Sequence, residues 1–203
     1  MNRIAAFALL TVVSLGLYGM SHGTGNAQEQ SCAAAKPLAA TLKPFAKGEL
    51  AGVLTPEIPK ALPNLAFLSP EGKPMTLSDL RGKTVLLNLW ATWCAPCRKE
   101  MPDLDKLQAT LGGTDFEVVA VSIDQRNLDK PKAFLQEIGV SKLAYYSDPS
   151  AKIFQALKAV DRAFGMPTTL LIDKNGCELG YLAGPAHWAS DDAFAMIKAA
   201  LGR

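Results

Sequence analysis

Short apolar runs alternate along the chain with longer segments in which apolar and charged residues are mixed. The runs at 84–90 and 116–123 are almost continuously apolar, which is typical of strands that are covered on both faces. The mixed segments have helical length and are bounded by Gly, Pro and Asp residues. This order predicts an α/β fold in which a mixed central sheet is flanked by helices on both faces.

Turn and cap residues set the expected limits of each element. Strands are expected at 65–68, 75–77, 84–90, 116–123, 143–146, 168–173 and 177–182. Helices are expected at 95–111, 129–138, 148–157 and 191–201, after a first helix that begins near residue 37 and is interrupted near residue 44. Asp129 is an expected N-cap, and the proline-rich stretch 52–63 is expected to be a linker laid over the surface of the domain.

The N-terminus is predicted to be a targeting segment, because residues 4–20 follow Arg3 and carry no charge. They are either the apolar part of a cleaved secretory signal or an uncleaved anchor, which needs at least about 17 residues. Both interpretations place the body of the protein outside the cytoplasmic membrane, facing the periplasm. The chain then divides into an anchor or signal segment with a stalk at 1–31 and one domain at 32–203, of which 32–63 is an N-terminal extension.

Composition narrows the possible functions. The chain has 203 residues, of which 49% are apolar, and this is enough for one domain with a full core. Its formal net charge is +2, with no concentrated basic stripe, so nucleic acid is not an expected partner.

The motif that carries chemistry is Cys94-Ala95-Pro96-Cys97, preceded by Trp93, at the junction of an expected strand and an expected helix. A thiol at a helix N-terminus is stabilised as the thiolate by the helix dipole. The thiolate is the form that attacks another disulfide. A strand, a Cys-x-x-Cys motif and a helix in this order indicate a thioredoxin-like redox site.

Two further cysteines, Cys32 and Cys177, lie far from this motif. If Cys94 pairs with Cys97, then Cys32 pairs with Cys177 by elimination, and this bridge would tie the N-terminal stalk to the core. The alternative is that one or both are buried free thiols.

These features together resemble the thioredoxin superfamily. The resemblance rests on the segments 93–97 and 165–168, and the lead-in 80–83 and an αβ insertion at about 129–158 are similar to the TlpA branch. That branch contains membrane-tethered thiol:disulfide oxidoreductases, related to those that serve cytochrome biogenesis. Cys32 and Cys177 resemble an extra cysteine pair of the same branch.

The resemblance implies a thioredoxin-like fold and a role for each matching residue. Cys94 matches the nucleophile and Cys97 the resolving cysteine, while Pro167 matches a cis-proline that faces the disulfide. The backbone of Met166 would then pair with an extended client chain, as in strand addition. The remaining substrate contacts are expected at Trp93, Ala95 and Pro96. The alternative for Pro167 is a trans turn proline.

The chain departs from plain thioredoxin at Asn88, which stands where thioredoxin has a buried acid and cannot titrate. Glu100, one helical turn after Cys97, matches an acid of the TlpA branch. A partly buried carboxylate there would accept the proton of the resolving thiol and oppose formation of a nearby thiolate. The other interpretation is a surface glutamate at a helix N-terminus.

The expected function is thiol–disulfide exchange with exported proteins, and a membrane electron donor is expected to supply the electrons. The protein is expected to be a monomer without cofactor or metal. By resemblance, the clients would belong to cytochrome c maturation or to cytochrome oxidase assembly. Two alternatives are a thiol peroxidase, although Ala91 holds the place of the expected Thr, and a Sco-like copper chaperone that would use His187.

Overall fold

Seven strands form one central sheet in the structure, a computed structural model that describes residues 32–203. The order across the sheet is β2-β1-β5-β4-β3-β6-β7. The strands are β1 (Ala66–Leu68), β2 (Pro74–Thr76), β3 (Thr84–Trp90), β4 (Phe116–Ser122), β5 (Tyr146–Ser147), β6 (Thr168–Ile172) and β7 (Glu178–Ala183). Adjacent strands β3, β4 and β5 are parallel and all the other neighbours are antiparallel, so the sheet is mixed, as predicted.

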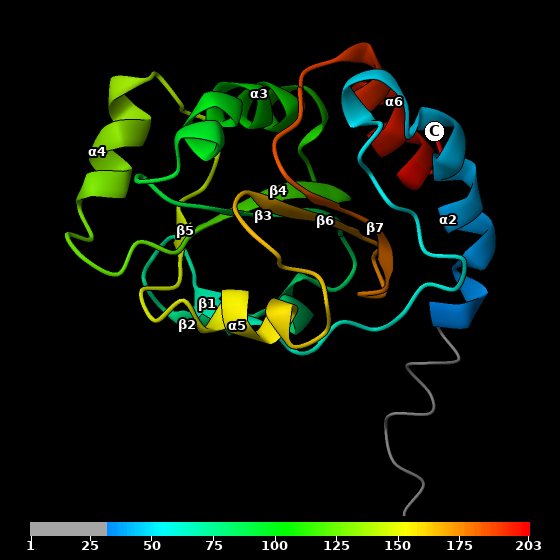
Figure 1. Cartoon of the computed structure of the whole chain (residues 1–203), viewed down its shortest axis with the longest axis horizontal. Helices are drawn as coiled ribbons and strands as arrows, with labels where there is room; N and C mark the ends of the chain where they lie inside the picture. The colour runs from blue at the N-terminus through cyan, green and yellow to red at the C-terminus, as the bar shows by residue number, and fades with distance from the viewer. Residues whose placement is uncertain (1–31) are drawn as a thin grey trace, which may run out of the picture.

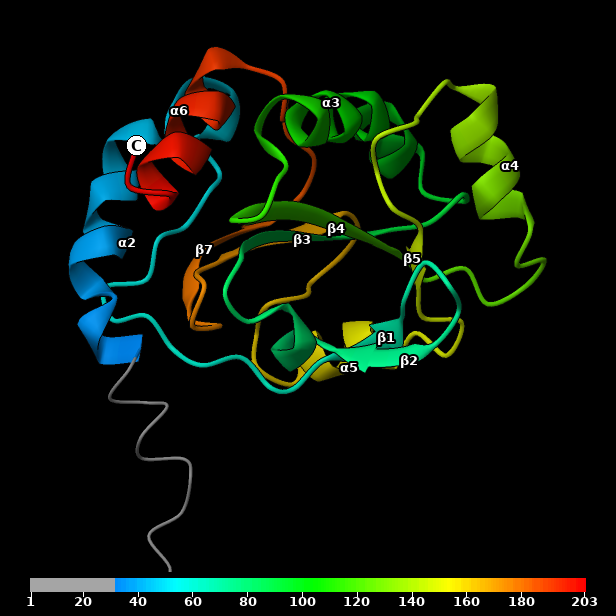
Figure 2. The same cartoon turned by 180° about the vertical axis from the view of Figure 1, so that it is seen from behind.

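Helices cover both faces of this sheet (Figures 1 and 2). They are α2 (Lys36–Leu42), α3 (Ala95–Leu111), α4 (Lys130–Glu137), α5 (Lys152–Lys158) and α6 (Asp191–Ala200). Helices α3 and α6 lie on one face and α5 lies on the other, while α2 packs beside α6 beyond β7. The predicted insertion at 129–158 contains α4, β5 and α5.

Burial explains why the apolar runs form the middle of the sheet. Every residue of β3 is buried, and it pairs with β4 over seven positions, from Thr84 opposite Phe116 to Trp90 opposite Ser122. Both faces of β3 lie beneath helices, which is why its sequence shows no alternation. The strand therefore has one fixed register, and the chain leaves its carboxyl end directly into α3.

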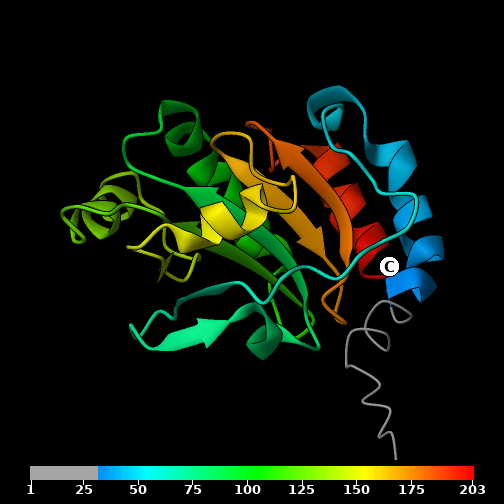
Figure 3. The same cartoon turned by 60° about the horizontal axis from the view of Figure 1, so that its bottom comes forward.

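A disulfide joins Cys32 to Cys177, and both residues are fully buried. The interpretation of these two residues as free thiols is therefore wrong. The stretch 52–63 is also more than a surface linker, because isolated bridges join Leu54 to Tyr181 and Ala61 to Cys177. Figure 3 shows the chain between α2 and β1 running past β7.

Two predicted boundaries are wrong by more than one residue. Strand β5 comprises only Tyr146 and Ser147 instead of 143–146. Helix α5 begins at Lys152 because the Asp148 carboxylate first accepts the N–H groups of Ser150 and Ile153 in a turn. Asp129 stands at the N-cap of α4, but its side chain makes no capping hydrogen bond.

The predicted anchor or signal segment and its stalk, at 1–31, lie outside the described residues. Within residues 32–203, none of the helices combines the length and the apolar character that a membrane crossing requires.

Candidate active site

The two cysteines lie at the point where β3 gives way to α3. The N–H of Cys94 donates to the carbonyl of Ala91 at 3.1 Å and closes a tight turn. Cys94 is the N-cap of α3, and its Sγ accepts the N–H of Cys97 at 3.3 Å. The two sulfurs form a disulfide, so the structure describes the oxidised site.

The two sulfur-bearing residues differ in exposure. Cys94 is 5% exposed and Cys97 is fully buried. An incoming sulfur therefore meets Cys94 first, which favours Cys94 as the attacking residue and Cys97 as the resolving one. After reduction, the positive end of the α3 dipole and the Cys97 N–H stabilise a Cys94 thiolate.

A buried carboxylate, Asp124, holds the turn from the β4 side. It accepts the Thr92 N–H at 2.9 Å, the Thr92 hydroxyl at 2.6 Å and the Ser122 hydroxyl at 3.0 Å. Sequence reasoning missed this residue. Its signal was its place just after the strand parallel to β3, since the carboxyl ends of parallel strands meet at one edge of a sheet.

Glu100 is buried, so its interpretation as a surface glutamate is wrong. Only 3% of the residue is exposed. Its Oε1 accepts the Asn88 amide N–H at 2.8 Å, and its Oε2 accepts the Ala186 N–H at 3.3 Å. Glu100 lies three residues after Cys97 on α3, and both residues belong to the buried face of the helix.

Burial raises the pKa of Glu100 from 4.5 to about 7. Three groups lower this pKa: the Asn88 amide has the largest effect, followed by the Ala186 N–H and the nearby indole of Trp188. The negative charge of Asp103 raises the pKa slightly. Desolvation exceeds these favourable contacts, because the carboxylate loses its water and gains only a few donors. Glu100 therefore changes its protonation state near neutral pH.

Asn88 holds Glu100 in place and connects it to the sheet. Its Nδ2 donates both to Glu100 and, at 2.9 Å, to the hydroxyl of Thr169 on β6. Asn88 Oδ1 and the indole N–H of Trp188 are buried and have no hydrogen-bond partner among the described residues. No sequence pattern places Ala186 or Trp188 at this site, because both come from the loop before α6.

The peptide bond between Met166 and Pro167 is cis. Strand β6 pairs with β3 up to Thr168 opposite Leu89, so the two preceding residues continue past the end of β3 towards the cysteine turn. Pro167 uses its carbonyl to accept the N–H of Gly184. Within residues 32–203, the backbone N–H and C=O of Met166 take part in no hydrogen bond, so both are free to pair with an added strand.

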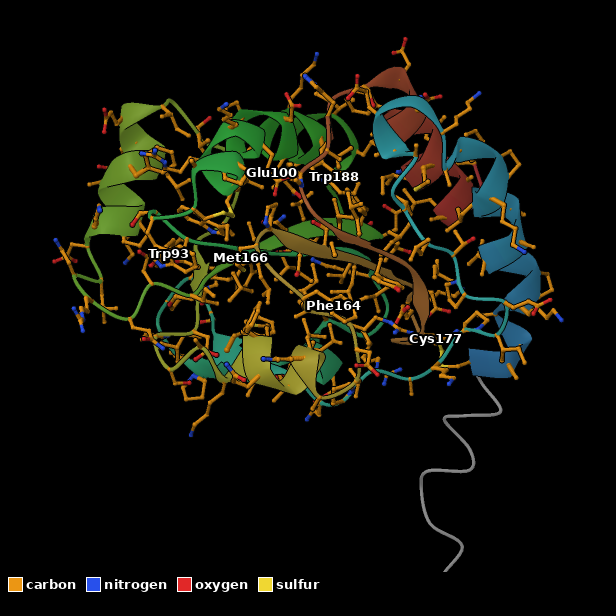
Figure 4. All side chains as sticks on the ribbon, viewed as in Figure 1. Trp93, Glu100, Phe164, Met166, Cys177 and Trp188 are labelled. Carbon is orange, nitrogen blue, oxygen red and sulfur yellow. A yellow bond between two sulfur atoms is a disulfide. The ribbon has the colours of Figure 1, made fainter. Side chains whose placement is uncertain are left out.

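The other predicted substrate contacts, Trp93, Ala95 and Pro96, are all exposed, and Trp93 is 63% exposed. Figure 4 shows Trp93 and Met166 near one another in the projection, on the side where α3 begins. Ala95 and Pro96 also line a cavity of about 460 Å³, whose other lining residues are Glu49, Lys99, Glu100, Asp103, Pro185, Ala186 and His187.

His187 lies at the mouth of this cavity. Its Nδ1 is 2.9 Å from Oδ2 of Asp103, and its side chain is largely exposed. In the part of the chain that the structure describes, no group of three or more His, Cys, Asp and Glu residues is arranged to hold a metal ion. His187 is therefore engaged with a carboxylate of α3, in a loop that also supplies a hydrogen bond to Glu100.

This sheet, with a Cys-x-x-Cys motif at the start of α3 and a cis-proline before β6, defines a thioredoxin-like fold, as predicted. Residues 58–177 match the AhpC/TSA family, and the chain belongs to that family.

Among curated relatives, the chain is 36% identical over 120 residues to the thiol-disulfide oxidoreductase ResA of Bacillus anthracis. The match covers 59% of this chain and 66% of that relative, so just under two thirds of its length is matched. The chain is also 32% identical over 114 residues to ResA of Bacillus subtilis. That match covers 56% of this chain and 60% of that relative.

Solved structures show the same fold. A putative thiol:disulfide interchange protein DsbE from Chlorobium tepidum superimposes with a TM-score of 0.59 and 32% identity, covering 70% of this chain and 96% of that one. A second thiol:disulfide interchange protein from Chlorobium tepidum TLS has a TM-score of 0.59 and 29% identity, covering 71% of this chain and 97% of that one.

Proposed function

We propose that this chain is a thiol:disulfide oxidoreductase that reduces disulfides of exported proteins. The observation that carries the proposal is a Cys-x-x-Cys pair whose first cysteine caps helix α3, together with the buried carboxyl of Glu100 on the same buried helix face as Cys97, where burial raises its pKa to about 7. Relatives named as thiol-disulfide oxidoreductases and thiol:disulfide interchange proteins support it.

The reaction begins with the site reduced. The Cys94 thiolate attacks one sulfur of the client disulfide, that S–S bond breaks, and the other client sulfur leaves as a thiolate that takes a proton from water. Cys97 then gives its proton to Glu100, and its sulfur attacks the Cys94 sulfur of the mixed disulfide. The second client thiolate leaves, and two electrons have passed from the cysteine pair to the client.

Client binding uses the exposed groups around Cys94. The free N–H and C=O of Met166 pair with an extended client segment, and the exposed indole of Trp93 covers the reacting sulfurs. Ala95 and Pro96 complete the contact surface at the start of α3. Because these hydrogen bonds join backbone to backbone, this way of binding tolerates different client sequences near the cystine.

The finer assignment is to the TlpA branch, which the Cys32–Cys177 disulfide and the insertion at 129–158 support. In this proposal, residues 1–31 export or anchor the chain and residues 32–203 form a monomeric redox domain in the periplasm. An oxidising compartment would keep the cysteines as a disulfide, so a membrane electron donor must return two electrons after each turnover. The clients would be proteins of cytochrome c or cytochrome oxidase biogenesis.

A Cys97→Ser variant tests the proposed chemistry. Without the resolving thiol, the mixed disulfide between Cys94 and the client should accumulate, and mass spectrometry would identify the bound protein. A Cys94→Ser variant is the matched control and should trap far less. If Cys97→Ser traps nothing and the reduced wild type reduces no disulfide, the proposal is wrong.

A second candidate, thiol peroxidase, is favoured only by the AhpC/TSA family match. Peroxidatic sites of that type have a Thr three residues before the reactive cysteine, and here that residue is Ala91. The neighbouring Thr92 donates its hydroxyl to Asp124 and is not available to a peroxide. Peroxide turnover by the purified reduced protein, comparable with its disulfide reduction, would support this second function.

A further inference from the structure

Phe164 stands out as a large apolar residue exposed on the loop that leads to Met166. It is 68% exposed, whereas its neighbour Ala163 is fully buried. The next residue, Gly165, is held by its carbonyl, which accepts the Thr168 hydroxyl at 2.7 Å. The phenyl ring therefore projects into solvent from a backbone that is fixed on both sides.

Arg162 holds the same loop through contacts with strand β7. Its Nε donates to the Glu178 carboxylate at 2.6 Å, and its guanidinium lies 4.5 Å from the centre of the Tyr181 ring. Its Nη1 also donates to the carbonyl of Asp161 at 3.0 Å. Glu178 is 1% exposed, so this ion pair is largely desolvated and holds the loop firmly against β7.

The position of Phe164 relates it to the client surface. Phe164 precedes Met166 by two residues, and in Figure 4 the labels of Trp93, Met166 and Phe164 follow one another across the molecule. A client segment that pairs with the free backbone of Met166 and continues along the preceding loop reaches Phe164. We propose that Phe164 is a substrate-binding residue that contacts an apolar side chain of the client a few residues from its cystine, with Arg162 as a positioning residue.

This inference rests on the proposed function and adds a preference for clients with an apolar residue beside the cystine. A second copy of the chain is a poorer occupant. Phe164 and the partly exposed Val160 offer little apolar area, whereas a stable protein interface buries at least about 1,200 Å². A short extended segment needs only one or two such anchors.

The test compares three disulfides reduced by the pre-reduced protein in single turnovers. Two are cystine-linked peptide dimers that differ only in Leu or Ser at the positions flanking the cysteine, and the third is hydroxyethyl disulfide. Phe164→Ala should slow reduction of the leucine peptide about tenfold. It should leave the serine peptide and hydroxyethyl disulfide within about twofold of wild type, since neither fills the site.

The matched control is Ile58→Ala, because Ile58 is 55% exposed and lies in the stretch 52–63; it should change none of the three rates. Arg162→Ala should repeat the selective loss on the leucine peptide, and Arg162→Lys should recover part of it.

Equal rates of Phe164→Ala and wild type on the leucine peptide would overturn the inference. So would an equal slowing on all three disulfides, or a dimer seen by gel filtration that Phe164→Ala abolishes with unchanged peptide rates. If the wild type reduces all three disulfides but Phe164→Ala does not selectively slow the leucine peptide, only this inference is wrong. If the wild type reduces none of them, the proposed function falls with it.

Discussion

Replacing Glu100 with Gln removes a buried carboxyl whose pKa is raised to about 7. The amide is almost isosteric, and its oxygen can still accept the Asn88 N–H that now meets Oε1 at 2.8 Å. The substitution therefore changes the charge of the site far more than its shape. Its main effect should appear in how stability depends on pH.

The size of this effect follows from the difference between the folded and unfolded pKa of Glu100. Between pH 4.5 and about 7 the folded protein holds the proton more tightly than the unfolded chain does. The free energy of unfolding therefore falls as pH rises through this window. A shift from 4.5 to about 7 corresponds to a loss of about 3 kcal/mol, fully present above pH 7. The Gln variant lacks this loss.

Urea unfolding of the oxidised protein across this range checks the prediction. Near pH 4.5 the variant and the wild type should have similar stability, and near pH 8 the variant should be more stable by up to about 3 kcal/mol. Glu137→Gln, at an exposed glutamate of α4, is the matched control and should run parallel to the wild type. Parallel curves for Glu100→Gln as well would refute a buried, titrating Glu100.

Two other substitutions test the supports around the site. Replacing both Cys32 and Cys177 with Ser removes a disulfide that joins residues 145 positions apart in the sequence. In the chain-entropy model this should lower the free energy of unfolding by up to about 5 kcal/mol, and an unchanged melting temperature would contradict a stabilising role. Asp124→Asn replaces an acceptor of three hydrogen bonds with a group that also donates. It should cost about 1–3 kcal/mol and speed hydrogen exchange at the Thr92 amide, and wild-type exchange there would argue against Asp124 as the support of the turn.

The elements around the cysteines could be predicted from sequence because their signals are local. Strand β3 is an unbroken apolar run, and α3 begins with Pro96 in its first turn and stops at Gly112. Strand β5 was misplaced because its only parallel partners, Val121 and Ser122, select Tyr146 and Ser147 through tertiary pairing. The strand propensity of the residues just before Tyr146 carries no such information.

Local spacing predicts one part of the site, and the family resemblance predicts another. Cys94 and Cys97 follow from their spacing, whereas the roles expected of Pro167 and of Glu100 follow only from the resemblance. The burial of Glu100 depends on Ala186 and on the residues of β3, which lie far apart in the sequence. No sequence pattern marks Phe164, because an aromatic residue in a loop is equally suited to a core, and only the fold leaves it exposed.

The two carboxylates beside the cysteine turn have different consequences for the chemistry. Asp124 accepts three hydrogen bonds from Thr92 and Ser122 and holds the turn that precedes the cysteines. Glu100 accepts fewer hydrogen bonds, at 2.8 and 3.3 Å, and burial raises its pKa to about 7, so both its protonated and its ionised form are populated at neutral pH. Because Cys97 must release a proton when the disulfide closes, an ionised Glu100 can accept that proton, and the transfer avoids leaving a thiolate and a carboxylate together in the core. Asn88, where thioredoxin carries its buried acid, no longer titrates and instead orients Glu100, so the acid has moved from the strand to the helix.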